Sequence, residues 1–340
     1  MAAARPFRTA TTAEFPVIDV GPFLAGEPDA LESTAGEVRA ALSNLGFMMF
    51  RNTGVKQRLI DGAFAASRSF HALPLDEKMA LKVNNHQIGY VPMSSSLNEA
   101  AAVDGTKGLR RDAAENLTFY QERSPDDPKV VAGERFRGLN QWPPDDRLPG
   151  FRKAMVDYHM SLMTLGYALL PLFARALGMP ENYFDSWFKD PTCVIRMVRY
   201  PAVGELRSDQ FGASSHSDAG FITMLPQADQ PGLQIQTPAG EWVDQPIVRD
   251  AFVVNSGNML KQLSNDVFKA TPHRVTTAVD KDRYSLAFFF NPDLDDVIAP
   301  VSSCVSADNP ARHQPVVYRD WYSWYLEKTY AHYQRRDAAE

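Results

Sequence analysis

Two histidines and an aspartate have the spacing of a metal site. His216 and Asp218 are two residues apart, and His273 lies in a later segment, 272–275. Residues i and i+2 of a strand point to the same face of a sheet, so His216 and Asp218 can present an imidazole and a carboxylate to one point. A later strand can bring His273 to that point. Two histidines and one carboxylate occupy one face of an octahedral metal and leave three positions open for other ligands.

A second pair with the same spacing could bind a carboxylate. Arg283 and Ser285 are also two residues apart, and a guanidinium with a neighbouring hydroxyl grips a carboxylate in a fixed orientation. The apolar run 286–290 follows, so we expect a buried strand. An arginine buried there would need an anion to neutralise it. The alternative is a surface arginine on an edge strand.

The elements that would position these residues are short strands. Between residues 193 and 291, runs rich in Val, Ile, Phe and Thr alternate with Gly, Pro, Asp and Asn, a pattern typical of an all-β sandwich or barrel. We expect strands at 193–200, 221–226, 232–237, 241–243, 251–256, 273–278 and 284–291.

The N-terminal half is mainly helical in pattern. We expect strands at 15–20 and 46–50, helices at 29–45, 57–72 and 151–177, loops over 89–141, and an aromatic helix at 318–334. No linker separates two independent domains. The fold class is therefore a mainly β core with flanking helices in one compact unit. Its parts are a disordered or frayed tail at 1–13, an N-terminal region at 14–130 packed on the core, and a β region with a C-terminal helix at 150–340.

The composition is that of an ordinary globular protein, with 340 residues, 44% hydrophobic and 22% charged. A net charge of −6 argues against a surface that follows nucleic-acid phosphates. Two cysteines are too few for a disulfide framework, and no apolar run is long enough to cross a bilayer. The N-terminus lacks the apolar core of a secretory signal. We expect a cytoplasmic monomer or homodimer with no nucleic-acid or membrane partner.

Several other polar and aromatic residues have no motif around them. We interpret Cys193 as an inert core thiol, and the aromatic residues Trp321, Trp324 and Tyr325 as core or interface. The remaining histidines are interpreted as structural or surface residues: His71, His86, His159, His313 and His332.

The chain resembles a known family over roughly residues 14–330, and most specifically over 193–292. The family is that of the iron(II)- and 2-oxoglutarate-dependent dioxygenases, in the branch that includes isopenicillin N synthase. Upstream, 15–19 and 46–47 resemble its N-terminal region. The motifs that carry the resemblance are 199–201, 216–218, 232–234, 242–243, 251–257, 259–260, 269–275, 283–285 and 290–292.

This resemblance implies a double-stranded β-helix, or jelly roll, with Fe(II) in its mouth. His216, Asp218 and His273 would hold the iron, while Arg283, Ser285 and Tyr200 would bind 2-oxoglutarate. With O2, such an enzyme oxidises an unactivated C–H bond of a small molecule by hydroxylation, desaturation or cyclisation, and releases succinate and CO2. The protein orients the bound groups and excludes water, and the metal supplies the difficult chemistry.

Two departures from the family pattern stand near the site. Val198 replaces an asparagine that relatives often carry, which removes one polar contact to the co-substrate. Gly257-Asn258 replaces a Gly-Asp pair, a change that we expect to alter a structural hydrogen bond without touching a metal ligand.

Substrate contacts follow from strand parity. If Arg283 and Ser285 face the barrel interior, Phe289 and Asn291 do so as well. On the earlier strand Arg196 shares a face with Tyr200, and it could bind an acidic substrate group or pair with a protein carboxylate. Ser217 and Asn116 complete the candidate substrate residues.

Three alternatives remain open at this point. An isopenicillin N synthase-like oxidase shares the Arg-x-Ser element but does not use 2-oxoglutarate. A non-catalytic metal- or ligand-binding barrel would be favoured by loss of a metal ligand or of Arg283, and all of these are present. A zinc hydrolase can use the same three ligands, but it has no evident need for Arg283 and Ser285.

Overall fold

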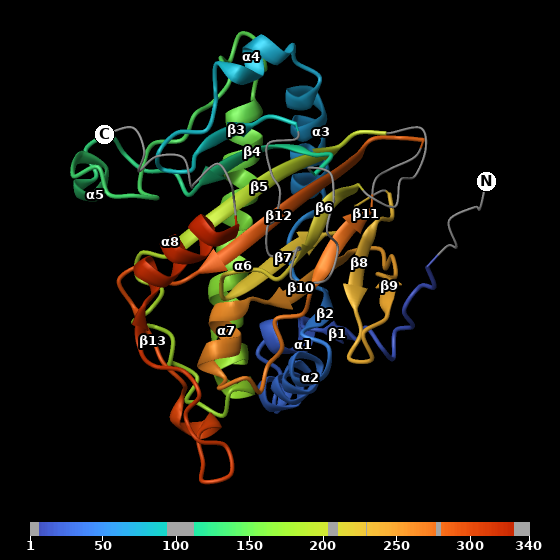
Figure 1. Cartoon of the computed structure of the whole chain (residues 1–340), viewed down its shortest axis with the longest axis vertical. Coiled ribbons are helices and arrows are strands. Elements are labelled where there is room, and N and C mark those ends of the chain that lie inside the picture. Colours follow the sequence, from blue (N-terminus) through green and yellow to red (C-terminus); the bar gives the residue numbers. More distant parts are fainter. Residues whose placement is uncertain (1–6, 94–111, 203–209, 229, 277–279, 330–340) are drawn as a thin grey trace.

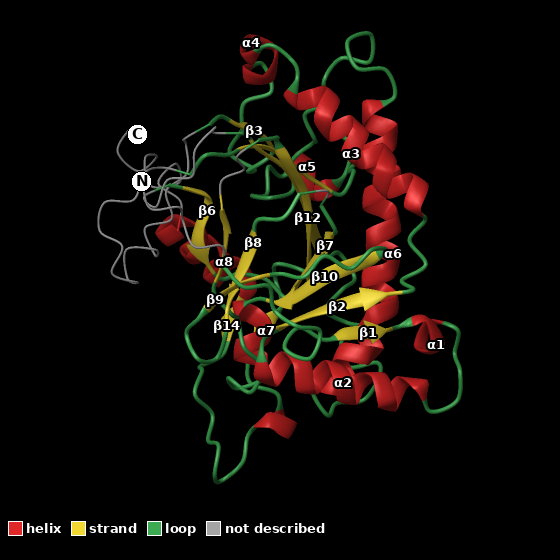
Figure 2. Ribbon diagram, turned by 90° about the vertical axis from the view of Figure 1, so that its right-hand side faces the viewer, coloured by secondary structure: helices red, strands yellow, loops and turns green. Residues whose placement is uncertain are grey.

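Two β-sheets form the centre of the molecule, and helices cover the larger one. The computed structural model describes residues 7–93, 112–202, 210–228, 230–276 and 280–329. Figure 2 shows helices on one side of the larger sheet and the smaller sheet on the other. This is the mainly β core with flanking helices that the sequence predicts. No helix in the described ranges is long and apolar enough to span a membrane.

The larger sheet contains eight strands in the described residues, in the order β1-β2-β10-β7-β12-β5-β4-β3. All neighbours pair antiparallel except β1 and β2. Its strands are β1 Val17–Asp19, β2 Phe47–Arg51, β3 Gly89–Val91, β4 Glu115–Tyr120, β5 Thr192–Tyr200, β7 Ile222–Pro226, β10 Ala251–Ser256 and β12 Arg283–Asn291.

The smaller sheet has the order β6-β11-β8-β9 within the described residues. Its strands are β6 Phe211–His216, β8 Leu233–Gln236, β9 Trp242–Asp244 and β11 His273–Thr276. In Figure 1 these strands are labelled to the right of β7 and β10 of the larger sheet. A short hairpin, β13 Val297–Ile298 with β14 Val316–Val317, lies outside both sheets.

Helices α2 (Ala30–Asn44), α3 (Gln57–His71) and α6 (Phe151–Ala176) pack together on the outer face of the larger sheet. The long α6 begins after Gly150, whose φ of 72° suits glycine. The shorter helices are α1 Gly21–Leu24, α4 Leu75–Met79, α5 Pro128–Val131, α7 Asn258–Leu263 and α8 Tyr318–Thr329, with a 3₁₀ turn at Ser302–Cys304.

Strand β12 shows why the residues divide into two faces. Leu286, Phe288 and Phe290 are buried in the core shared with the helices. The alternate residues Arg283 and Ser285 face a cavity between the sheets. Apolar burial on one face thereby fixes the register, and a one-residue shift would exchange the faces.

Three expectations differ from the structure. Residues 89–141 do not form loops alone, because β3, β4 and α5 lie there. Strand β6 is missing from the expected strands, although the spacing of His216 and Asp218 is interpreted as that of a strand. Residues 7–13 of the expected tail are described, and Arg8 and Ala10 form backbone hydrogen bonds with Asp244 of β9. The last residues of the expected helix, 330–334, and of the expected strand, 277–278, lie outside the described residues.

Candidate metal and co-substrate site

The three predicted ligands meet between the two sheets. His216 ends β6 and His273 begins β11, and the two residues are cross-strand partners. Asp218 lies in the turn after β6, so the expected strand spacing of i and i+2 does not apply to it. Its Oδ1 lies 3.9 Å from His216 Nε2 and 3.7 Å from His273 Nε2. One ligand atom from each residue lies within 4.8 Å of the others.

Hydrogen bonds orient each of these side chains. Nδ1 of His216 is 2.7 Å from the Ser214 carbonyl, and Nδ1 of His273 is 3.2 Å from the Thr271 carbonyl. A proton on each Nδ1 would donate to these carbonyls and leave the Nε2 lone pair facing the centre. Outer hydrogen bonds of this kind set the tautomer of metal-binding histidines.

The carboxylate of Asp218 is divided between two roles. Its Oδ2 accepts hydrogen bonds from Thr223 Oγ1 at 2.5 Å and from Asn255 Nδ2 at 2.7 Å. Its Oδ1 is left facing the two imidazoles. The motif 251–257 contains Asn255, but nothing in the sequence links Thr223 to the site.

The electrostatics suit a cation. Burial lowers the pKa of His216 to about 4, so this imidazole is neutral and able to bind a metal near neutral pH. Burial opposes ionisation of Asp218, but the two histidines and its hydrogen bonds outweigh that effect and lower its pKa. Two imidazole nitrogens and one carboxylate oxygen are a donor set that fits Fe(II).

The replacement at Asn258 is closer to the site than expected. Its backbone N–H and its side-chain Nδ2 donate to the carbonyl of Asp218, at 2.8 and 3.0 Å. The expectation that this position touches no ligand residue is therefore wrong, because Asn258 fixes the main chain of Asp218. The contact arises because α7 begins directly behind the turn that carries Asp218.

A first cavity, of about 1000 Å³ including its open mouth, contains all three ligands. The register of β4, β5 and β12 arranges its floor in rows across the sheet. These rows are Tyr200 with Arg283, then Asn116, Val198 and Ser285, then Thr118, Arg196 and Ala287. All of these except Thr118 line the first cavity.

Arg283 is buried in the wall of this cavity, with 3% of its surface exposed. Its Nε donates to the Gln230 carbonyl at 3.3 Å, while its buried Nη1 has no hydrogen-bond partner among the described residues. No described carboxylate forms an ion pair with it, and burial lowers its pKa. Its guanidinium lies 5.2 Å from the ring centre of Tyr200. A buried cation in this state fits an anionic ligand.

A second cavity, of about 850 Å³ including its open mouth, is lined by His216 and Asp218. Asn116, Arg196 and Phe289 line both cavities. Ser217 and Asn291 line the second cavity alone. The hydroxyl of Ser217 donates to the Ala270 carbonyl at 2.8 Å, and Asn291 Oδ1 accepts from the Phe221 N–H at 2.8 Å.

Asp112 and Tyr325 are cavity residues that bond to the chain beside the metal ligands, and the sequence does not predict either of them for the site. Asp112 lines the first cavity, and its Oδ1 accepts from the backbone N–H and the hydroxyl of Ser214. Tyr325 lines the second cavity, and its hydroxyl donates to the Ser217 carbonyl, between two metal ligands. Asp112 follows an aperiodic segment. The interpretation of Tyr325 as a core or interface residue is incomplete, because its position on the last helix brings it to the wall of the second cavity.

The other histidines in the described residues lie outside the site. His71 and His159 are buried near backbone carbonyls, His86 is 3.0 Å from the Glu134 carbonyl, and His313 is 2.9 Å from Asp266. His332 is outside the described residues. Cys193 is fully buried, and burial raises the pKa of its thiol.

Known protein families match both parts of the chain. Residues 15–145 match the N-terminal region described as that of the non-haem dioxygenase in morphine synthesis, and 190–292 match the 2OG-Fe(II) oxygenase superfamily. Among curated relatives, 2-oxoglutarate-dependent dioxygenase citB of Monascus ruber is 34% identical over 304 residues, 87% of this chain and 90% of the relative. Clavatol oxidase claD of Penicillium crustosum is 31% identical, over 89% and 93% of the two chains.

Solved structures agree with these matches. A full-length Neurospora crassa protein in complex with alpha-KG and 5-formyluracil is similar with a TM-score of 0.80 and 26% identity, over 93% of this chain and 96% of that one. JOX2 in complex with 2OG, Fe and JA has a TM-score of 0.75 and 26% identity, over 96% and 88%. Named relatives that use 2-oxoglutarate favour this co-substrate over the oxidase alternative. The chain belongs to the 2OG-Fe(II) oxygenase superfamily, and it is a non-haem Fe(II)- and 2-oxoglutarate-dependent dioxygenase.

Proposed function

We propose that His216, Asp218 and His273 hold the Fe(II) of this oxygenase, and that Arg283, Ser285 and Tyr200 bind its 2-oxoglutarate. One observation carries the proposal. Three converging ligand atoms and the unbonded Nη1 of a buried arginine face the same cavity. A dicarboxylate that reaches from the metal to Arg283 would complete both sets of contacts at once.

The chemistry is shared between the bound groups and the chain. Fe(II), 2-oxoglutarate and O2 supply the oxidation of a substrate C–H bond, with release of succinate and CO2. His216 and His273 keep their Nε2 atoms directed at the centre because Nδ1 is held by a carbonyl. Arg283 would orient the distal carboxylate of 2-oxoglutarate through a charge-assisted hydrogen bond. Ser285 and Tyr200 line the same wall and would limit water around it.

We also propose that a small-molecule substrate occupies the second cavity. Arg196, Asn116 and Phe289 would contact it next to the metal, and Ser217 and Asn291 further along the wall. Because the described bonds of Ser217 Oγ and Asn291 Oδ1 go to the main chain, their contribution would be mainly to shape. The complexes of the Neurospora crassa protein and of JOX2 contain small ligands, 5-formyluracil and JA, which supports a substrate of this size.

The partners, the cellular location and the oligomeric state of the enzyme are proposed from its charge and composition alone. A net charge of −6 supports a protein that binds neither nucleic acid nor an anionic membrane surface. We propose a cytoplasmic enzyme that acts as a monomer or homodimer.

Succinate release tests the assignment. Purified enzyme with Fe(II), O2 and 2-oxoglutarate should form succinate slowly without substrate and faster with a suitable small molecule. The variants His273→Ala and Arg283→Ala should lose this turnover, and His313→Ala should keep it as a matched control. Full succinate release by His273→Ala would contradict the proposed ligand set.

A further inference from the structure

The outer wall of the second cavity is aromatic. Phe289 of β12 and Tyr120 of β4 line it from the larger sheet, and Tyr322, Tyr325 and Leu326 of α8 line it from the other side. Figure 1 shows α8 beside the end of β12, and backbone hydrogen bonds join its first residues to the segment that follows β12. A flat ring can therefore lie between the sheet and α8.

Contacts on α8 hold these rings in place. The hydroxyl of Tyr325 donates to the Ser217 carbonyl, and the Tyr325 ring stacks on Trp321 with centroids 5.5 Å apart. The ring of Tyr322 packs against Phe136 at 5.2 Å. A ligand in the cavity would meet rigid aromatic surfaces that are ordered before it binds, and such preorganised surfaces favour planar ligands.

The wall of the second cavity contains a cation, Arg196. Among the described lining residues, Arg196 is the only permanent cation and Asp218 is the only carboxylate. The carboxylate faces the two histidines, so a bound metal would neutralise it. Asp112 lines the first cavity, and burial raises its pKa.

The position of Arg196 is set by the sheet. It stands between Thr118 and Ala287, one row further from Arg283 than Ser285 is. Its guanidinium lies 5.9 Å from the ring centre of Phe289. An acidic oxygen at Arg196 would therefore place an attached ring beside Phe289 and next to the metal ligands.

We infer that the substrate is a planar aromatic or conjugated acid, whose ring lies between Phe289 and α8 and whose acidic oxygen binds Arg196. This inference rests on the proposed function, because it assumes that the second cavity is the substrate side of the metal. In this inference Arg196 recognises the negative charge of the substrate, and Tyr322 recognises its flat ring.

Four probes separate charge from shape. They are 2-naphthoate, 2-naphthamide and their saturated decalin counterparts, titrated calorimetrically under anaerobic conditions into enzyme loaded with Fe(II) and 2-oxoglutarate. We expect 2-naphthoate to bind at least about tenfold more tightly than both the amide and the saturated acid. In Arg196→Gln the acid and the amide should bind alike, with the preference for the flat ring retained. In Tyr322→Leu the preference for the flat ring should fall while the preference for the acid remains.

Arg152→Gln, at an exposed position on α6, is the matched control and should behave as the wild type. Equal binding of acid and amide to the wild type, or an undiminished acid preference in Arg196→Gln, would overturn the inference. Failure to bind any of the four probes would overturn it too. Binding of 2-oxoglutarate is measured first in the same experiment. Its absence would instead count against the proposed function.

Discussion

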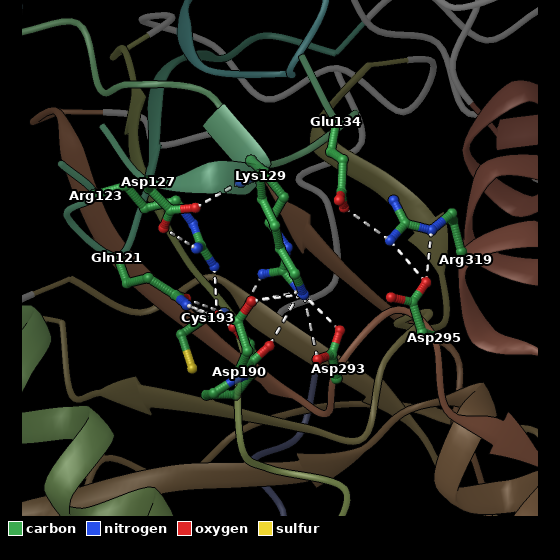
Figure 3. A network of polar contacts seen from close by, with 12 residues as sticks. Gln121, Arg123, Asp127, Lys129, Glu134, Asp190, Cys193, Asp293, Asp295 and Arg319 are labelled. Atoms are coloured by element: carbon green, nitrogen blue, oxygen red, sulfur yellow. Dashed lines mark hydrogen bonds and ion pairs between the residues drawn. The ribbon is translucent and has the colours of Figure 1, made fainter. Parts of the chain in front are cut away.

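Two buried polar clusters in this molecule differ in how completely their charges are paired. One is the ionic cluster of Arg123, Asp127, Lys129, Arg137, Asp190 and Asp293, at the ends of β5 and β12. Figure 3 shows most of it, together with a neighbouring pair of Arg319 with Glu134 and Asp295. The other is the barrel cavity with His216, Asp218, His273 and Arg283.

In the ionic cluster every charge faces an opposite charge. Arg137, with 1% of its side chain exposed, contacts Asp293 at 3.0 Å and Asp190 at 3.7 Å, and Lys129 pairs with the same two aspartates. In the barrel cavity, two imidazole nitrogens, one carboxylate oxygen and Nη1 of Arg283 face open space. Burial alone therefore does not mark a functional site, whereas buried groups whose partners are incomplete point to a ligand.

Removing a metal ligand should have the largest effect. His216→Ala, Asp218→Ala or His273→Ala should weaken Fe(II) binding by more than about 100-fold, because even outer-shell changes cost 10- to 100-fold. Anaerobic Fe(II) titration followed by tryptophan fluorescence measures the loss. His313→Ala, which removes a histidine near Asp266, should leave the titration unchanged.

Breaking the ionic cluster should reduce stability but not ligand binding. Arg137→Met leaves Asp190 and Asp293 with one cation fewer, and removal of one partner from a buried ion pair costs about 3–5 kcal/mol. Urea denaturation should show this loss, and calorimetry on the folded variant should give the wild-type affinity for 2-oxoglutarate. A weaker affinity of Arg137→Met for 2-oxoglutarate would contradict the distinction between a structural ionic cluster and a ligand-binding cavity.

Replacement of Arg283 by methionine should leave the stability intact and weaken the binding of 2-oxoglutarate, the reverse of the result expected for Arg137→Met. Arg283→Met removes a buried cation that has no described carboxylate partner, so the metal-free protein should be as stable as the wild type or more stable. Its affinity for 2-oxoglutarate should fall by about 2–5 kcal/mol, the cost of removing one member of a buried charge pair. Denaturation and calorimetry on the pair Arg283→Met and Arg137→Met would show the reversal directly. Loss of stability in Arg283→Met would contradict it.

Acid should destabilise the helical side of the molecule. Burial lowers the pKa of His159 to about 4, against about 6.5 in an unfolded chain. The unfolded state then binds more protons between these values, so stability is full above pH 6.5 and falls as the pH drops towards 4, by at most roughly 3 kcal/mol. His159→Gln should flatten this part of the stability curve measured by urea denaturation. An unchanged slope would show that His159 does not cause it.

The outer hydrogen bonds of the site should matter least, but measurably. Thr223→Val keeps the shape of the side chain and removes the hydrogen bond to Asp218 Oδ2. We expect Fe(II) affinity to fall about 10- to 100-fold. Thr164→Val, which removes a hydroxyl bonded within α6, is the control. Equal affinities in the two variants would mean that Thr223 does not orient Asp218.

The sequence predicts a site residue well when it lies on a strand whose alternate residues are apolar. The alternation in β12 places Arg283 and Ser285 on the inner face, because the apolar residues of that strand pack against the helices. Strand β6 is missing from the expected strands because its small polar residues show no strand pattern. Its strand partner among the described residues is β11. Strand β4 is also missing from the expected strands, for a related reason. Its Glu115 is buried together with partners that are distant in sequence, the cations Lys78 and Arg199 and the hydroxyl of Tyr90.

The most direct test of the account is an anaerobic titration by visible absorption. Metal-free enzyme receives Fe(II) and then 2-oxoglutarate, with Arg283→Met in parallel. The account predicts that a metal-to-ligand charge-transfer band appears with 2-oxoglutarate. It also predicts that the variant needs at least about 30-fold more 2-oxoglutarate for half of the band, as the loss of binding energy implies. Iron binding without this band, or the same half-saturation in both proteins, would contradict the claim that metal and Arg283 share one ligand.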